Sequence, residues 1–299
     1  MGRTAELPSR NWQSVARQSC YLLLTRLISQ ALPAETVKLM DALQPGDAAE
    51  LLDSLTDGRV TAAVRDGVLS LLEGHPLALT WAGNLLARGD EDPRRLADDW
   101  RSGGLPRLSD PTEARHTLKW LFDRSVRGLD ETARRVLSAA GLLARAPFPL
   151  AMAANLWDEG LAADEGAARL TLKSLVQSGL LRLTVEADHW EFTHVLGYRF
   201  AGEESGSDPV LRDLLARWLS GYLQAALKQG NRSEPGVSLT RLLEHADALQ
   251  RADDDHRLWE SLVKSLLYET LDRLTDLGRL DLMKLAVDSV AEWLGRLRS

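Results

Sequence analysis

The sequence predicts a mainly α-helical chain with a remnant of a parallel α/β sheet at its start, a winged helix in its middle and repeat-like helices at its end. Three observations predict this fold class. Apolar residues recur at helical spacing over most of the chain beyond Gln44, a continuous apolar run lies upstream at residues 19–25, and helical segments lead into alternating segments between residues 181 and 192. The 299 residues, of which 44% are hydrophobic, suffice for two or three domains.

Composition argues against several classes of protein. The formal net charge of −7 is spread along the chain, which disfavours a surface built to neutralise nucleic-acid phosphates. No apolar run reaches the roughly 18 residues of a membrane span, and residues 1–10 lack the apolar core of a signal peptide. We therefore expect a cytoplasmic protein with no nucleic-acid or membrane partner. Cys20, the single cysteine, cannot form a disulfide within the chain and is expected to be a buried apolar residue.

Residues 1–40 are predicted to be the remnant of an α/β domain. The apolar run at residues 19–25 is typical of a strand buried on both faces of a parallel sheet, and a second short strand is expected at residues 35–39. Two strands with little helix between them cannot form such a sheet alone. We therefore expect the rest of the sheet to lie upstream of this sequence.

Residues 41–112 are predicted to form a helical domain. Pro45 suits a helix start, and apolar residues recur at helical spacing over residues 64–72, after which Gly74 supplies a stop. Pro76 suits the first turn of the next helix, because the backbone N–H that proline lacks would have no partner there. These signals predict helices in close succession.

A connection is expected at the end of this domain. Residues 90–111 are rich in Asp, Arg, Gly and Pro, which is typical of a loop, and a short helix is expected within them at residues 96–100.

Residues 113–205 are predicted to form a winged helix. Apolar residues alternate with polar ones at residues 181–185 and 190–192, on either side of a polar turn at residues 186–189. Helices that lead into such a hairpin are typical of a winged helix. The helices are expected at residues 118–126, 131–143, 150–157 and 165–178.

Residues 206–299 are predicted to be all helical. The last two helices, joined at residues 276–279, suit the start of a tetratricopeptide-type array, although a full repeat signature is absent. The nine tryptophans of the chain lie mostly at helical core spacing, so we expect packing anchors rather than a stacking platform for bases. The helices are expected at residues 209–228, 239–251, 258–277 and 281–297.

Several segments, taken in order, resemble the back half of an NB-ARC-type signalling NTPase, one of the AAA+-related STAND switches. The strand at residues 21–26 is similar to the family's sensor strand, which ends in an arginine, here Arg26. Residues 73–79, Glu-Gly-His-Pro-Leu-Ala-Leu, resemble the Gly-x-Pro-Leu-Ala-Leu signature and are the most specific match. Residues 192–195, Phe-Thr-His-Val, fall where the family carries a Met-His-Asp motif. The helix after the sensor strand and the opening of the winged helix are matched by residues 43–52 and 122–157.

The resemblance covers about residues 19–205 and implies contacts with a nucleotide. It implies that Arg26 senses the terminal phosphate of ATP, and that Pro76 packs against the adenine beside Gly74 and Leu77. It also implies that His194 reaches the β-phosphate of bound ADP.

Two departures limit what the resemblance implies. The sequence has no Gly-x-x-x-x-Gly-Lys-Ser/Thr loop and no apolar strand that ends in paired acids, which are the groups that cradle phosphates and bind magnesium. We therefore expect no ATP hydrolysis by this chain, weak or absent binding of ADP or ATP, and no metal site. Val195 stands where the family has an acid, so His194 lacks the carboxylate that would orient it.

Three of these residues also have a purely structural interpretation. Pro76 suits a helix start without any ligand. His194 suits a strand-to-helix junction as a satisfied polar residue, and Arg26 by itself would be an exposed arginine.

Three functions follow as alternatives. In a switch, ADP held between the nucleotide domain and the winged helix keeps a closed form, ATP releases it, and the C-terminal helices bind protein partners, among them a full-length relative. A winged-helix transcription factor would insert residues 165–178 into DNA, but this helix offers only Arg169 and Lys173, and the wing is acidic over residues 186–191. A nucleotide-independent scaffold built on the helices after Asp208 is the third.

Overall fold

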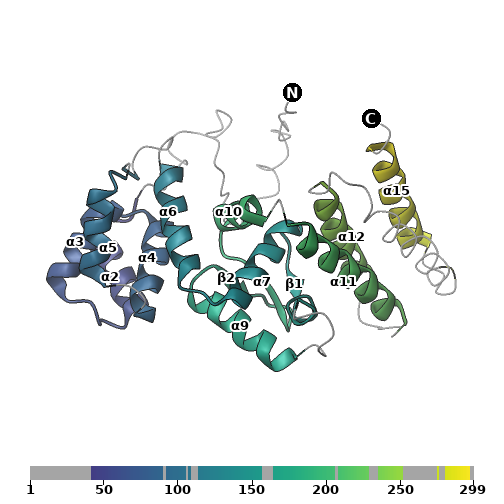
Figure 1. The fold of residues 1–299 in the computed structure, drawn as a ribbon, viewed down its shortest axis with the longest axis horizontal. Coiled ribbons are helices and arrows are strands. Elements are labelled where there is room, and N and C mark those ends of the chain that lie inside the picture. Colours follow the sequence, from purple (N-terminus) through teal and green to yellow (C-terminus); the bar gives the residue numbers. More distant parts are fainter. Residues whose placement is uncertain are drawn as a thin grey trace, which may run out of the picture. The chain divides into compact units, whose positions relative to one another are not determined.

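The computed structural model places part of the chain, which Figure 1 draws in colour. Arg26, Cys20, both predicted strands before residue 40 and most of the predicted helix at residues 258–277 lie outside that part. The chain divides into two compact units, Met1–Ala42 and Leu43–Ser299, and only the second is described below. The described residues are 42–89, 92–105, 107–108, 114–156, 164–205, 208–228, 235–251, 275 and 280–296.

The described part of the second unit is mainly helical, as the sequence predicts, and its strands form one small antiparallel sheet in the order β1-β3-β2 (Figure 1). The strands are β1 (Phe148–Pro149), β2 (Leu181–Leu183) and β3 (His189–Phe192). The helices are α2 (Pro45–Thr56), α3 (Ala62–Leu72), α4 (Pro76–Arg88), α5 (Pro93–Ser102), α6 (Ala114–Arg127), α7 (Glu131–Leu142), α8 (Leu150–Ala154), α9 (Glu165–Gln177), α10 (Val195–Ser205), α11 (Pro209–Lys228), α12 (Pro235–Arg251) and α15 (Leu280–Arg296).

Residues 90–111 are less of a connection than the sequence predicts, because α5 fills ten of them. Its surface is so rich in Arg and Asp that composition suggested a loop. Leu96, Ala97 and Trp100 nevertheless form a narrow apolar stripe that is buried, and the Asp92 carboxylate accepts a hydrogen bond from the Arg94 backbone N–H at the helix start. The helix therefore depends on burial of that stripe.

Helix α6 joins the first helices to those that follow. The Arg88 guanidinium of α4 donates to the Ser125 carbonyl of α6 at 3.2 Å, and Arg124 of α6 pairs with Asp99 of α5 at 2.7 Å. Trp120 of α6 also packs edge-on against Trp100 of α5, with the ring centroids 5.5 Å apart. Buried apolar residues run without a break from α2 through α6 to α10. The predicted boundaries between domains stay predictions.

Strand β1 is absent from the prediction. It pairs with β3 through Phe148 opposite Trp190 and Pro149 opposite His189, and β2 pairs with the other edge of β3. A two-residue strand that includes a proline has no alternating pattern to detect, so only the tertiary pairing reveals it. The predicted hairpin around residues 186–189 is confirmed.

The helices α7 and α10 approach each other very closely. A β-carbon added at Gly141 of α7 would lie 2.6 Å from the backbone nitrogen of Gly202 in α10. Real β-carbons do not approach backbone atoms so closely, so glycine at both positions permits the contact. Helix α10 itself was not predicted.

We expect Gly141→Ala to destabilise the fold. Although alanine favours helices more than glycine, the added methyl forces α7 and α10 apart, and overpacking of this kind costs about 1–3 kcal/mol. The matched control is Gly221→Ala in α11, where an added β-carbon meets nothing within 4 Å. The control should be neutral or stabilise by up to about 1 kcal/mol. Urea unfolding of both variants gives the comparison, and equal free energies of unfolding would contradict the prediction.

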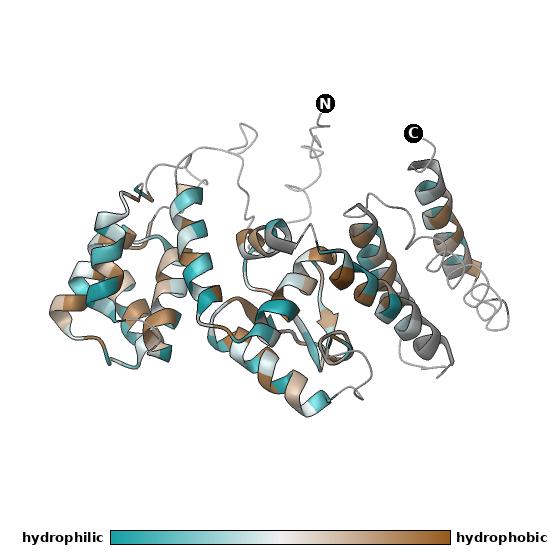
Figure 2. Cartoon of the chain, in the orientation of Figure 1, coloured by the Kyte–Doolittle hydropathy of each residue, from teal (hydrophilic) through white to brown (hydrophobic). Residues whose placement is uncertain are grey.

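The C-terminal helices pack in sequence, α11 on α12 and α12 on α15. The Trp293 indole N–H of α15 donates to the Asp247 carboxylate of α12 at 3.2 Å. Figure 2 shows apolar and polar residues together on the longer helices that it colours, and no helix of the described part is both long and apolar enough to cross a membrane. Five tryptophans of this part are buried, which confirms their expected role as packing anchors: Trp81, Trp100, Trp190, Trp218 and Trp293.

Candidate functional site

The predicted Gly-x-Pro segment forms the turn between α3 and α4. Glu73 and Gly74 both have left-handed backbone angles, with φ of 49° and 68°. Glycine accepts such an angle without strain, and the buried Gly74 carbonyl accepts a hydrogen bond from the Leu43 backbone N–H at 2.8 Å. The glycine of the motif therefore has a structural reason in this chain.

His75 caps the start of α4. Its Nδ1 accepts a hydrogen bond from the Ala78 backbone N–H at 3.4 Å, and burial lowers the pKa of its half-buried ring. Pro76 begins the helix and is exposed, whereas Leu77 is half-buried. In the described part of the chain the Pro76 ring is exposed, so it is accessible to a ligand.

His194 caps the start of α10 in the same manner. Its Nδ1 accepts from the Leu196 backbone N–H at 3.1 Å, and its half-buried ring lies directly after β3. In a neutral imidazole that accepts at Nδ1, the proton is carried by Nε2. His194 is therefore a satisfied polar residue at a strand-to-helix junction.

Thr193 ties this junction to the turn after α9. Its hydroxyl donates to the Gly179 carbonyl at 2.7 Å, and its backbone N–H donates to the Leu180 carbonyl at 3.1 Å. The residue after β3 and the two residues before β2 are thereby held together beside His194.

Helix α4 packs against both parts of this junction. A β-carbon added at Gly179, whose φ is 72°, would lie 2.2 Å from the Asn84 amide nitrogen of α4. A β-carbon at Gly197, in the first turn of α10, would lie 3.6 Å from the Trp81 ring. Trp81 follows Pro76 by five residues, or about 7.5 Å along the helix axis. The structure thus brings the helix that begins with the Gly-x-Pro motif against the turn that carries His194.

An aromatic cluster forms the base of this contact. Trp81 of α4, Phe122 of α6 and Phe200 of α10 are fully buried, and their ring centroids lie 5.4–6.5 Å apart. The Trp81 indole N–H is buried without a hydrogen-bond partner among the described residues. We refer to the packing of α4 on Gly179 and Gly197, together with these three rings, as the α4–α10 junction.

The sequence analysis singled out Pro76 and His194, which flank this junction, but not the residues at which α4 meets α10. Trp81 was expected, like the other tryptophans, to be a packing anchor, while Asn84 and Gly197 had no motif or periodicity that would have marked them. Their importance depends on which helices meet, which no local pattern encodes.

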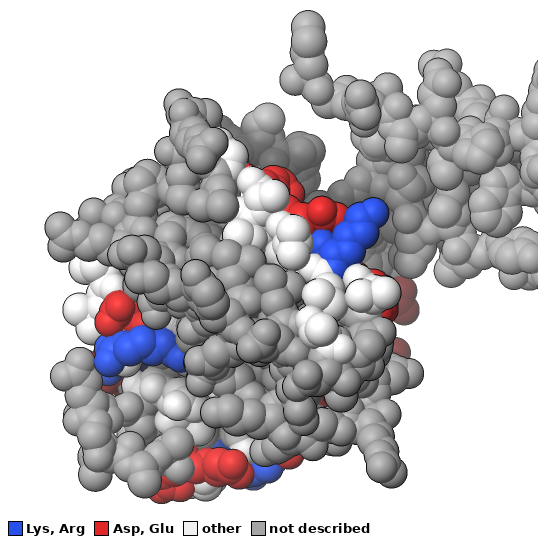
Figure 3. All heavy atoms as spheres, turned by 90° about the vertical axis from the view of Figure 1, so that its right-hand side faces the viewer, with Lys and Arg blue, Asp and Glu red and all other residues white. Residues whose placement is uncertain are grey.

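The acids of the β2–β3 hairpin are all paired with arginines. Glu186 pairs with Arg241, and Asp188 accepts two hydrogen bonds from Arg169 of α9, which lower the pKa of Asp188. The third pair joins Glu191 to Arg182 at 2.7 Å. Figure 3 shows, on the face it draws, acidic and basic side chains side by side rather than in a patch of one sign.

No group of three or more His, Cys, Asp or Glu side chains in the described part is arranged to hold a metal ion. Models of known protein families do not match the chain, and the search of curated proteins gives no match either.

Proposed function

We propose that the chain is the regulatory part of an NB-ARC-type nucleotide-dependent switch. The α4–α10 junction carries this proposal, because it joins the two segments that resemble the nucleotide-contacting motifs of that family. Pro76 begins one helix of the junction and His194 precedes the other, and each helix start is capped by a histidine Nδ1.

The proposal includes the finer architecture. Residues 1–40 are then an α/β remnant, residues 41–112 a helical domain and residues 113–205 a winged helix. The order α7-β1-α8-α9-β2-β3, with one short strand before two helices and a hairpin after them, supports the winged helix. Residues 206–299 are repeat-like helices.

The junction suits a diphosphate on electrostatic grounds. Helix N-termini carry partial positive charge, and anions bind there. The imidazole of His194 lies at the start of α10, and the exposed Pro76 ring offers an apolar contact to a base. A ligand that touches both helix starts favours the arrangement in which they lie together, in proportion to its differential affinity for that arrangement.

Titration of fluorescent ADP into the full chain, followed by anisotropy with and without Mg²⁺, tests the proposal. We expect weak saturable binding, and a loss of about tenfold in affinity for His194→Asn, because its amide oxygen replaces the Nδ1 cap while the imidazole, which the resemblance places at the β-phosphate, is removed. His116→Ala, on the exposed side of α6, is the matched control and should bind like the unchanged chain.

His194→Ala removes the helix cap as well. A comparison of His194→Ala with His194→Asn therefore separates an effect on folding from an effect on ADP binding. A folded chain that shows no saturation at millimolar ADP would contradict the proposal.

A DNA-binding function is disfavoured by the pairing of Arg169. This arginine lies on α9, the helix that would enter the major groove, and its guanidinium is engaged by the Asp188 carboxylate. Contact with a phosphate or a base would require that pair to break beside an acidic hairpin.

A protein-interaction scaffold is favoured by a different observation. Several large apolar side chains of the described part are exposed, notably Leu170 on α9, Val185 after β2 and Leu280 on α15, with exposed fractions of 70%, 110% and 72%. Each of these side chains would be removed from water by a protein partner that covered it, and such a contact needs no nucleotide. Capture of a partner that is unaffected by ADP and by His194→Asn would support this function over the switch.

A further inference from the structure

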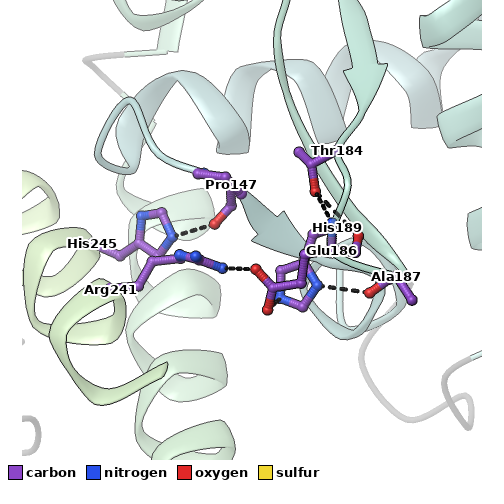
Figure 4. Close-up of polar contacts among 7 residues, drawn as sticks. All are labelled: Pro147, Thr184, Glu186, Ala187, His189, Arg241 and His245. Atoms are coloured by element: carbon purple, nitrogen blue, oxygen red, sulfur yellow. Dashed lines mark hydrogen bonds and ion pairs between the residues drawn. The ribbon is translucent and has the colours of Figure 1, made fainter. Parts of the chain in front are cut away.

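Helix α12 contacts the β2–β3 hairpin through polar groups (Figure 4). The Arg241 guanidinium pairs with the Glu186 carboxylate at the hairpin turn. One turn further along α12, His245 Nε2 donates to the Pro147 carbonyl at 3.2 Å, just before β1. Two side chains of one helix thus hold both the hairpin and its neighbouring strand.

The hairpin turn is itself well ordered by hydrogen bonds. The Glu186 backbone N–H donates to the Thr184 hydroxyl at 3.2 Å, and that hydroxyl donates to the Glu186 carbonyl at 3.1 Å. His189 lies 3.4 Å from the second Glu186 carboxylate oxygen and also bonds the Ala187 carbonyl at 2.9 Å. Movement of the Glu186 side chain therefore also displaces His189, where β3 begins.

The ion pair is the exposed part of a contact that is otherwise buried. Both helices bury apolar side chains in the core, namely Leu211, Leu215 and Trp218 of α11 and Leu242, Leu243, Ala246 and Leu249 of α12. The Arg241 and Glu186 side chains, by contrast, keep 20% and 41% of their surface exposed. Ion pairs with this exposure stabilise weakly, so the pair at the hairpin is more easily broken than the apolar contacts of α12.

The α12 contact and the α4–α10 junction lie at opposite ends of β3. The strand runs from His189 to Phe192 and continues into Thr193 and His194. At roughly 3.3 Å per residue, the hairpin turn and His194 are about 16 Å apart along the chain. A paired strand of this length has little freedom to bend, so displacement of one end moves the other.

We propose that α12 regulates the α4–α10 junction through β3. When Arg241 is bound to Glu186 and His245 to Pro147, β3 is held and the His194 turn keeps its place against α4. Loss of the Arg241–Glu186 pair loosens that turn. This regulation rests on the proposed function, since the junction is the proposed nucleotide contact.

Hydrogen exchange of the full chain tests the coupling. We expect Arg241→Gln and Glu186→Gln to speed amide exchange about two- to fivefold at residues 190–196 as well as in α12, because each breaks the partially exposed Arg241–Glu186 pair. The reversed pair, Glu186→Arg with Arg241→Glu, should restore slow exchange. Arg217→Gln, which removes the exposed pair with Asp213 on α11, is the matched control and should leave residues 190–196 unchanged.

Faster exchange confined to α12, or unchanged exchange in both segments, would overturn the coupling. The same variants are titrated with fluorescent ADP, and a change in affinity by a similar factor would support regulation of nucleotide binding. If the unchanged chain binds no ADP, the proposed function fails, and the exchange at residues 190–196 still decides whether α12 controls the His194 turn.

Discussion

Replacement of Trp81 by alanine should destabilise this protein more than any other single truncation in the α4–α10 junction. The side chain is fully buried and packs between Phe122 of α6 and Phe200 of α10, beside Gly197. Truncation of a buried tryptophan removes its apolar contacts and leaves a cavity, which costs about 3–5 kcal/mol. The measurement is the free energy of unfolding in urea, with hydrogen exchange to locate the effect.

Two further variants make this experiment specific. Trp81→Phe keeps an aromatic ring and also removes an indole N–H that has no hydrogen-bond partner among the described residues, so its cost should be clearly smaller. Trp120→Ala, at a half-buried position on α6, should likewise cost less. Trp81→Ala is expected to accelerate exchange in the first turn of α10. A loss below about 1 kcal/mol would show that the junction is not tightly packed.

Acid should weaken the fold through His245. This histidine is buried, and burial lowers its pKa to about 4, with Arg241 and His189 acting in the same direction. Because the pKa is near 6.5 in an unfolded chain, the unfolded state binds more protons between these values. The stability present above pH 6.5 is therefore lost progressively as the pH falls towards 4, by about 2 kcal/mol at pH 5 and roughly 3 kcal/mol in full.

The comparison that isolates this effect is His245→Gln. Glutamine does not titrate in this range, and its amide N–H can still donate to the Pro147 carbonyl. Urea unfolding at pH 7.5 and pH 5 should show a smaller loss of stability for His245→Gln than for the unchanged chain, whereas His116→Gln on α6 should behave like the unchanged chain. Parallel losses for all three proteins would contradict a buried neutral His245.

The sequence predicted the helices with strong local signals. The helix expected over residues 165–178 is observed as Glu165–Gln177, and the helix after Gly74 begins at Pro76 as predicted. Glycine with positive φ, proline in a first turn and a regular apolar stripe act within one turn of chain, so they can be recognised without the fold. Helix α5 was underestimated because its stripe is narrow and its remaining residues are charged.

For the candidate site, too, the sequence predicted the local structure around its residues but not their tertiary contacts. Gly74, Pro76, Leu77 and His194 stand in segments whose local structure the sequence anticipated, namely a helix stop, a helix start and the end of a hairpin. Arg26 lies outside the described residues, and its role stays a prediction. Only the resemblance to nucleotide switches implied that the segments around Pro76 and His194 lie near each other, and no local pattern of the sequence indicated it.

The sequence by itself indicated where most helices of the described part lie and which of their faces are apolar, since backbone angles and side-chain spacing are local properties. Only the tertiary structure decided that α4 packs on Gly179 and Gly197, and that α12 contacts the hairpin through Arg241 and the chain before β1 through His245. These contacts join residues about 100 or 55 positions apart, and they depend on the fit of surfaces that no local pattern specifies.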